Sequence, residues 1–176
     1  MHHKDFRSDT VTRPTNAMRA AMAEAAVGDD VFDEDPSIIR LEKMIAEMTG
    51  KETAMYVPSG TMSNLIALRL HGSPGDEFLC EENCHVIQYE QGGYAQVNGL
   101  VCQTIPGEFG VVKPEKFEGR IRADNRHLPR TKFILIENTH NRGGGRIQPY
   151  DYLSETCRWA HENGLTAHLD GARLFN

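Results

Sequence analysis

Short apolar runs and helical patterns alternate along the chain from residue 53 to residue 169. The apolar runs cover 53–57, 77–80, 100–105, 133–136 and 165–169, and the helical patterns cover 61–71, roughly 85–97, 114–122 and 150–163. Strands that are each followed by a helix run in the same direction, and a parallel sheet needs helices on both of its faces. The sequence therefore predicts an α/β fold of three layers, in which a mainly parallel sheet lies between two layers of helices.

The region before residue 53 follows a different pattern. After a polar N-terminal arm, a first helix is expected to open at Pro14. The acidic run 28–35 lacks the glycine and the terminal glutamate of a calcium loop, so we interpret it as a solvated loop. Asp35 then caps a second helix, which ends at Gly50. Because the chain has no internal repeat and no low-complexity linker, we predict one domain over residues 1–176.

Composition and charge argue against several kinds of partner. The net charge of −6, with both signs interspersed, gives no reason to expect nucleic acid or a membrane surface. No apolar stretch has the length of a membrane span, and the N-terminus lacks the apolar core of a signal peptide. Cys80, Cys84 and His85 suggest zinc, but a fourth ligand at a recognised spacing is missing, so we expect no metal. Cysteines in apolar runs favour free thiols and a reducing, cytoplasmic setting.

The last apolar run ends in Asp170, and Arg173 follows three residues later. In open α/β sheets, ligands bind at the carboxyl ends of the strands. A carboxylate and a guanidinium at that edge suit a ligand that carries a cationic ring and anionic groups. Pyridoxal phosphate has this character, and an aspartate commonly pairs with its pyridinium nitrogen. Asp170 and Arg173 therefore predict a cofactor site at the end of the sheet.

Other candidate residues also follow strands or lie in loops. Gly60 and Thr61 begin a helix, where free amides and the helix dipole favour an anion, although such a turn is more often a simple helix cap. His85 follows the strand 77–80, and its alternative is a partly exposed loop histidine. His127 precedes the next strand and is interpreted most simply as a surface residue. Ser8 lies in the polar arm and carries no chemical signal by composition.

Five segments occur in the order in which one enzyme family has them. They are 7–12 (Arg-Ser-Asp-Thr-Val-Thr), 28–31 (Gly-Asp-Asp-Val), 57–62 (Val-Pro-Ser-Gly-Thr-Met), 137–141 (Glu-Asn-Thr-His-Asn) and 168–173 (His-Leu-Asp-Gly-Ala-Arg). Through these segments the chain resembles the low-specificity L-threonine aldolases, which are pyridoxal-phosphate-dependent lyases with the aspartate-aminotransferase fold. The resemblance runs from Phe6 to Asn176 and corresponds to the N-terminal part of the cofactor-binding large domain.

The resemblance implies a role for each cofactor-binding candidate. Gly60 and Thr61 would bind the cofactor phosphate, and Asp170 would pair with the pyridinium nitrogen. His85 would stack on the pyridine ring and act as the catalytic residue beside the β-hydroxyl group of the substrate. Arg173 would contact the polar edge of the cofactor and the substrate carboxylate.

The resemblance also implies the substrate and the reaction. Ser8 and Arg173 would bind the carboxylate of an amino acid, and His127 would be a second contact to its hydroxyl group. The reaction would cleave L-threonine or L-allo-threonine to glycine and an aldehyde, in threonine catabolism and glycine biosynthesis. The family implies a homo-oligomer, dimer or tetramer.

The lysine that binds the cofactor covalently in this family lies beyond the segment 168–173 and is not among these residues. We therefore expect residues 1–176 alone to be inactive. Two alternatives stay open: another pyridoxal-phosphate lyase of the same fold that catalyses β-elimination, and a non-catalytic module that keeps the fold.

Overall fold

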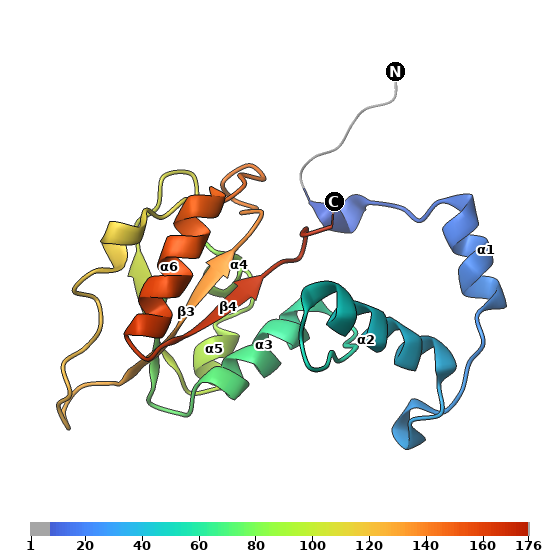
Figure 1. The fold of residues 1–176 in the computed structure, drawn as a ribbon, viewed down its shortest axis with the longest axis horizontal. Coiled ribbons are helices and arrows are strands. Elements are labelled where there is room, and N and C mark those ends of the chain that lie inside the picture. Colours follow the sequence, from blue (N-terminus) through green and yellow to red (C-terminus); the bar gives the residue numbers. More distant parts are fainter. Residues whose placement is uncertain (1–7, 176) are drawn as a thin grey trace. The chain divides into compact units, whose positions relative to one another are not determined.

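The computed structural model of the protein describes residues 8–175, and the chain divides into two compact units (Figure 1). The first unit is Met1–Pro58 and the second is Ser59–Asn176. We describe each unit by itself, and the expectation of a single domain over 1–176 stays a prediction. No helix of the described residues is long and apolar enough to cross a membrane.

In residues 8–58, the described part of the first unit, there are two α-helices, α1 (Asn16–Glu24) and α2 (Pro36–Thr49), and two short 3-10 helices, η1 (Asp9–Val11) and η2 (Asp30–Phe32). Helix α2 confirms both of its predicted ends. The carboxylate of Asp35 accepts the backbone N–H groups of Ser37 at 2.9 Å and Ile38 at 3.0 Å, and Gly50 closes the helix in the left-handed conformation. Helix α1 begins two residues after the predicted Pro14, because Thr15 caps it.

The second unit is built on a sheet of four parallel strands. They are β1 (Glu77–Glu81), β2 (Val101–Ile105), β3 (Thr131–Glu137) and β4 (Thr166–Asp170), in the order β2-β1-β3-β4. All three neighbouring pairs are parallel, and the last pair sets Glu137 beside Asp170. The carboxyl ends of β1, β3 and β4 therefore lie along one edge of the sheet.

Helices cover both faces of this sheet, as the alternation of patterns predicted. Successive residues of a strand point to opposite faces, so Phe78 and Phe133 lie in one apolar cluster, while Leu79 and Ile134 lie in the other. Helices α3 (Gly60–His71), α4 (His85–Gln88) and α5 (Gly93–Gln96) cover the first face. Helix α6 (Tyr150–Glu162) and the 3-10 helix η3 (Pro114–Phe117) cover the second, and α6 is seen in front of the strands in Figure 1. The three-layer α/β architecture is confirmed.

Three predicted elements are wrong. Residues 53–57 form no strand: they lie in the first unit, where the described residues offer no sheet to pair with, and the N–H of Tyr56 instead donates to Glu42 Oε1 at 2.7 Å. The helix expected over 85–97 is broken into α4 and α5, because Gln91 and Gly92 between them have φ values of 51° and 68°. The helix expected over 114–122 is only the short η3.

Candidate functional site

Acidic residues end three of the four strands at one edge of the sheet. Glu81 ends β1, Glu137 ends β3 and Asp170 ends β4. The loops that follow these strands meet there, and the N–H of Asn138 donates to the backbone oxygen of Asp170 at 3.0 Å. The parallel topology thus brings together polar groups from segments far apart in the chain, at the edge where α/β proteins bind ligands.

Asp170 is held by helix α3. Asn64, which lies buried in the second turn of α3, donates from Nδ2 to Asp170 Oδ2 at 3.0 Å and to Glu90 Oε1 at 2.8 Å. Glu90 Oε1 also bonds Nδ1 of His85 at 2.8 Å. One ligand atom from each of His85, Glu90 and Asp170 lies within 4.8 Å of the other two. The structure therefore places the predicted catalytic histidine beside the predicted partner of the pyridinium nitrogen.

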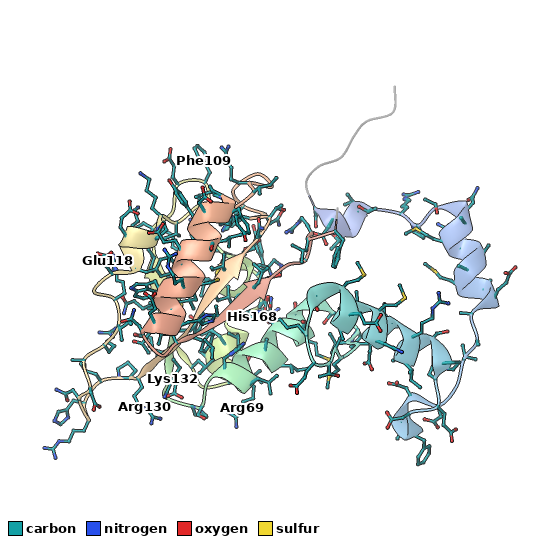
Figure 2. The ribbon with its side chains drawn as sticks, viewed as in Figure 1. Arg69, Phe109, Glu118, Arg130, Lys132 and His168 are labelled. Atoms are coloured by element: carbon teal, nitrogen blue, oxygen red, sulfur yellow. The ribbon has the colours of Figure 1, made fainter. Side chains whose placement is uncertain are left out.

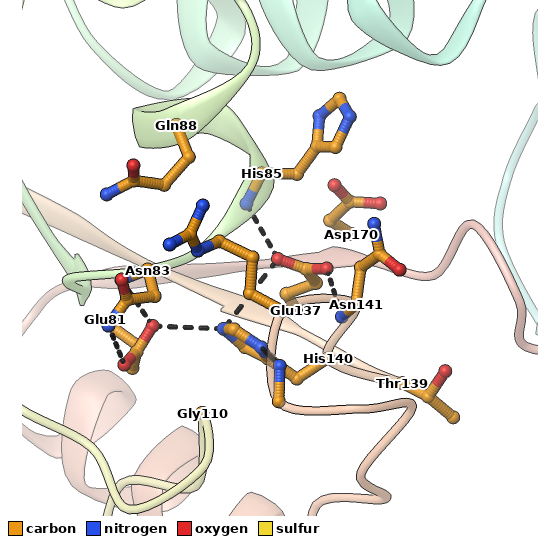
Figure 3. A network of polar contacts seen from close by, with 12 residues as sticks. Glu81, Asn83, His85, Gln88, Gly110, Glu137, Thr139, His140, Asn141 and Asp170 are labelled. Carbon is orange, nitrogen blue, oxygen red and sulfur yellow. Dashed lines mark hydrogen bonds and ion pairs between the residues drawn. The ribbon is translucent and has the colours of Figure 1, made fainter. Parts of the chain in front are cut away.

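The backbone of His85 is held in place by a side chain at the end of β3 (Figure 3). The buried carboxylate of Glu137 accepts the N–H of His85 at 2.7 Å through one oxygen and the N–H of Asn141 at 2.8 Å through the other. The side chain of His85 stays 34% exposed. The ring is thus anchored at its base and still accessible to a ligand.

A second buried pair lies beneath this contact. Nε2 of His140 lies 2.9 Å from Glu81 Oε2, and Nδ1 of His140 accepts the N–H of Gly143 at 3.0 Å. The bond at Nδ1 leaves the ring proton on Nε2, so the imidazole donates to Glu81. Burial raises the pKa of Glu81, but the bonds from His140 and from the Asn83 N–H outweigh this and hold it below its usual value. The carboxylate is therefore charged at neutral pH.

The start of α3 has the free backbone N–H groups that an anion site needs. The hydroxyl of Ser59 caps the helix by accepting the N–H of Met62 at 3.2 Å, which leaves the first N–H groups, those of Gly60 and Thr61, without an acceptor within the helix. A Cβ added at Gly60 would meet no atom within 4 Å, so there is open space beside these amides. Asn64 links this helix start to Asp170, and the two acidic side chains near His85 suit a cationic ring. The residues present fit pyridoxal phosphate.

Arg173 also lies at this edge. Its Nη1 donates to the backbone oxygen of Thr139 at 3.0 Å and lies 3.9 Å from Glu137 Oε1. Gly60, Thr61, His85, Asp170 and Arg173 are therefore all carried by segments that meet at the carboxyl edge.

The structure does not bring His127 to this cluster. It is exposed in the loop before β3, at the opposite edge of the sheet, where Arg130 pairs with Asp76 at 3.0 Å. In Figure 2, Arg130 and Lys132 mark this edge and Phe109 marks the edge with the carboxyl ends. Ser8 belongs to the first unit, where its hydroxyl lies 2.9 Å from that of Thr10. The substrate roles of His127 and Ser8 stay predictions.

Sequence reasoning missed four residues of the site: Asn64, Glu90, Glu137 and His140. A signal existed for Asn64, because it is an amide in the helix directly before the apolar stretch 65–68. Glu137 and His140 were visible only as parts of a motif. Glu90 was assigned to a continuous helix, and its position depends on the break after α4.

The thiols do not change this assignment of the site. Cys80 and Cys84 are buried, and Sγ of Cys80 lies 3.4 Å from Sγ of Cys102. Burial raises the pKa of the Cys80 thiol well above its usual value, which disfavours the thiolate that a metal would need. The expectation of no metal stays a prediction.

The fold and site define a class of α/β proteins with a ligand site at the carboxyl edge of a parallel sheet. A family model of beta-eliminating lyases matches residues 5–176, and the chain belongs to that family. It is 44% identical to a probable low-specificity L-threonine aldolase 2 of Arabidopsis thaliana over 98% of the chain and 50% of that protein. It is 42% identical to the low specificity L-threonine aldolase of Escherichia coli (strain K12), over 98% of the chain and 51% of that protein.

A solved structure shows the same fold. The threonine aldolase of Leishmania major superposes with a TM-score of 0.74 at 23% identity, covering 90% of this chain and 46% of the other. The chain spans about half the length of the curated relatives it matches.

Proposed function

We propose that a protein containing this chain cleaves L-threonine and L-allo-threonine to glycine and acetaldehyde with pyridoxal phosphate as cofactor. One observation carries the proposal: Asn64 holds Asp170 beside His85, at the same edge of the sheet as the start of α3. The relatives named as threonine aldolases support the choice of substrate.

Each group of this chain has a separate task. The amides of Gly60 and Thr61 would bind the phosphate, and Asp170 would accept a hydrogen bond from the ring nitrogen and keep it protonated. The cofactor supplies an electron sink for the bond that breaks. His85 removes the proton of the β-hydroxyl group, directly or through a water that it orients, because a neutral hydroxyl does not readily drive the cleavage at neutral pH. Arg173 binds the substrate carboxylate.

The test uses a full-length protein that contains residues 1–176. With cofactor added, L-threonine and L-allo-threonine should each give equal amounts of glycine and acetaldehyde. Pyruvate and ammonia from L-serine, without acetaldehyde from threonine, would instead indicate a β-eliminating lyase. Asp170→Asn should lower turnover about a thousandfold or more. Asp151→Asn, at an exposed aspartate of α6, is the matched control and should leave turnover unchanged.

We also propose a homo-oligomer in a reducing, cytoplasmic compartment, in threonine catabolism and glycine formation. Exposed apolar side chains on α2, among them Ile39, Met44 and Met48, support association with another copy. Four free cysteines support a reducing compartment. Light scattering of the full-length protein tests the association: a monomer at micromolar concentration would contradict it.

A further inference from the structure

We propose that Glu90 is a positioning residue: its buried carboxylate keeps His85 in the form protonated on Nδ1 and, through the amide of Asn64, holds His85 in place relative to Asp170. The catalytic meaning of this inference rests on the proposed function. The hydrogen-bond arrangement itself can be measured without any reaction.

Glu90 lies where a carboxylate is costly to bury. Its side chain is 1% exposed, and Oε2 has no hydrogen-bond partner among the residues that the structure describes. Within the second unit, two hydrogen bonds to Oε1 offset the cost of burying this carboxylate. The donors are Asn64 Nδ2 and His85 Nδ1, both at 2.8 Å. A residue needed only for the turn between α4 and α5 would not require this buried charge. The two bonds at Oε1 are therefore the reason that we infer for a glutamate at this position.

The direction of each bond follows from what a carboxylate can do. A charged carboxylate only accepts hydrogen bonds, so the atom of Asn64 that faces both Glu90 and Asp170 must be the donating nitrogen. The amide oxygen then faces Nε2 of His168 at 3.2 Å. Burial lowers the pKa of His168 to about 4, so its ring is neutral at pH 7 and can donate to Asn64 from Nε2. The reversed amide would place its oxygen against two carboxylates, and the arrangement is therefore unique.

The same argument fixes the ring of His85. Nδ1 faces the carboxylate of Glu90 and must carry a proton, so the neutral ring has its lone pair on Nε2. Nε2 is then the atom that accepts the substrate proton, and the charge of Glu90 stabilises the imidazolium that forms. An aspartate holds a catalytic histidine in the correct tautomer in the same way in serine proteases. Glu90 acts through His85 and does not touch substrate.

The first test reads the ring proton directly. In full-length protein labelled with ¹⁵N-histidine and free of cofactor, two-bond ¹⁵N–¹H spectra at alkaline pH should show His85 protonated on Nδ1. The signal is assigned by its loss in His85→Gln. In Glu90→Met, which has a similar volume and no carboxylate, the proton should move toward Nε2, the form that a free imidazole favours. Glu90→Gln, which keeps an accepting oxygen, should retain most of the Nδ1–H form.

A purely structural role for Glu90 would give a different result. Thermal stability would then fall in Glu90→Met while the position of the ring proton stayed the same. An Nε2–H tautomer of His85 in the unmodified protein would overturn the proposal outright. That spectrum needs no variant, so it decides the question even if Glu90→Met does not fold.

The second test uses kinetics. Glu90→Met should lower kcat roughly tenfold to a thousandfold with little change in KM, because ground-state binding does not involve this side chain. Glu90→Gln should fall between Glu90→Met and the unmodified protein. Glu82→Gln, at an exposed glutamate near the end of β1, is the control and should match the unmodified protein. A kcat of Glu90→Met equal to that of the control would contradict the positioning role.

The two proposals fail separately. If the full-length protein does not cleave threonine but His85 carries its proton on Nδ1 and loses it there in Glu90→Met, the proposed function is wrong and the positioning stands. If threonine is cleaved and the tautomer is Nε2–H, the positioning by Glu90 is wrong and the function stands.

Discussion

The buried carboxylate of Glu137, at the end of β3, accepts the backbone N–H of His85, at the start of α4, at 2.7 Å. The cap residue of α4, Cys84, makes no side-chain cap bond, so Glu137 takes the place of a cap from 52 positions away. This bond ties a four-residue helix, too short to be stable alone, to the carboxyl end of β3, one of the two inner strands. The bond therefore fixes the backbone of His85, from which the imidazole ring extends.

Replacing Glu137 by glutamine should destabilise the protein. Glutamine has one accepting oxygen for two N–H groups, those of His85 and Asn141, and one of them would be left buried without an acceptor. We expect the free energy of unfolding to fall by about 1–3 kcal/mol. Urea unfolding measures this. Glu155→Gln, at an exposed glutamate of α6, should change it by less than about 0.5 kcal/mol. Equal effects of the two substitutions would contradict the capping role of Glu137.

Gly110→Ala should be far more damaging than Gly144→Ala. Both glycines have positive φ, 83° and 79°, so alanine is strained at each by about 1–2 kcal/mol. A Cβ at Gly110 would also overlap the ring of His140, which the bonds to Glu81 and Gly143 hold in place, whereas a Cβ at Gly144 meets no atom within 4 Å. Thermal unfolding of the two variants checks this, and similar losses would mean that the ring of His140 can move aside.

The free energy of unfolding should decrease as the pH falls from about 6.5 to about 4, and His168 should cause part of this decrease. Burial, together with the nearby His71, lowers the pKa of His168 from 6.5 to about 4. In that range the unfolded chain binds a proton that the folded chain does not, so stability decreases as the pH falls, by up to about 3 kcal/mol. Below about pH 4 this effect is complete.

Comparison with a variant isolates this contribution from that of the carboxylates. His168→Gln should flatten the decrease between pH 6.5 and pH 4 in urea unfolding, and it keeps a donor for Asn64. His161→Gln, at an exposed histidine of α6, should keep the slope of the unmodified protein. Identical slopes in all three proteins would show that His168 titrates normally.

Phe133→Ala should remove about 3–5 kcal/mol of stability. Phe133 is fully buried at the centre of the sheet and stacks on Phe78 with ring centroids 5.1 Å apart. Phe109→Ala is the matched control, because that ring is 64% exposed and its centroid lies 5.3 Å from Cζ of Arg146. We expect this variant to lose about 1 kcal/mol of stability or less. Guanidinium unfolding measures both. A smaller loss for Phe133→Ala than for Phe109→Ala would contradict the position of the core.

Local patterns predicted the layers of the fold. The sequence prediction agrees to within about two residues with the four strands of the sheet, with helices α3 and α6 and with both ends of α2. Each of these depends on nearby side chains, through apolar periodicity, the cap at Asp35 or the left-handed Gly50. The position of Asp170 at a carboxyl end followed from the same patterns. A strand end in a parallel sheet has a known edge, whatever its neighbours are.

Contacts between distant segments decided the rest. The apolar run 53–57 has the composition of a strand, but a strand exists only where another strand accepts its hydrogen bonds, and none of the described residues offers one there. The sequence by itself determined which residues end the strands of the sheet. The tertiary structure alone decided that Asn64 and Glu90 join His85 to Asp170, because this relation depends on the order of the strands and the breaks between helices.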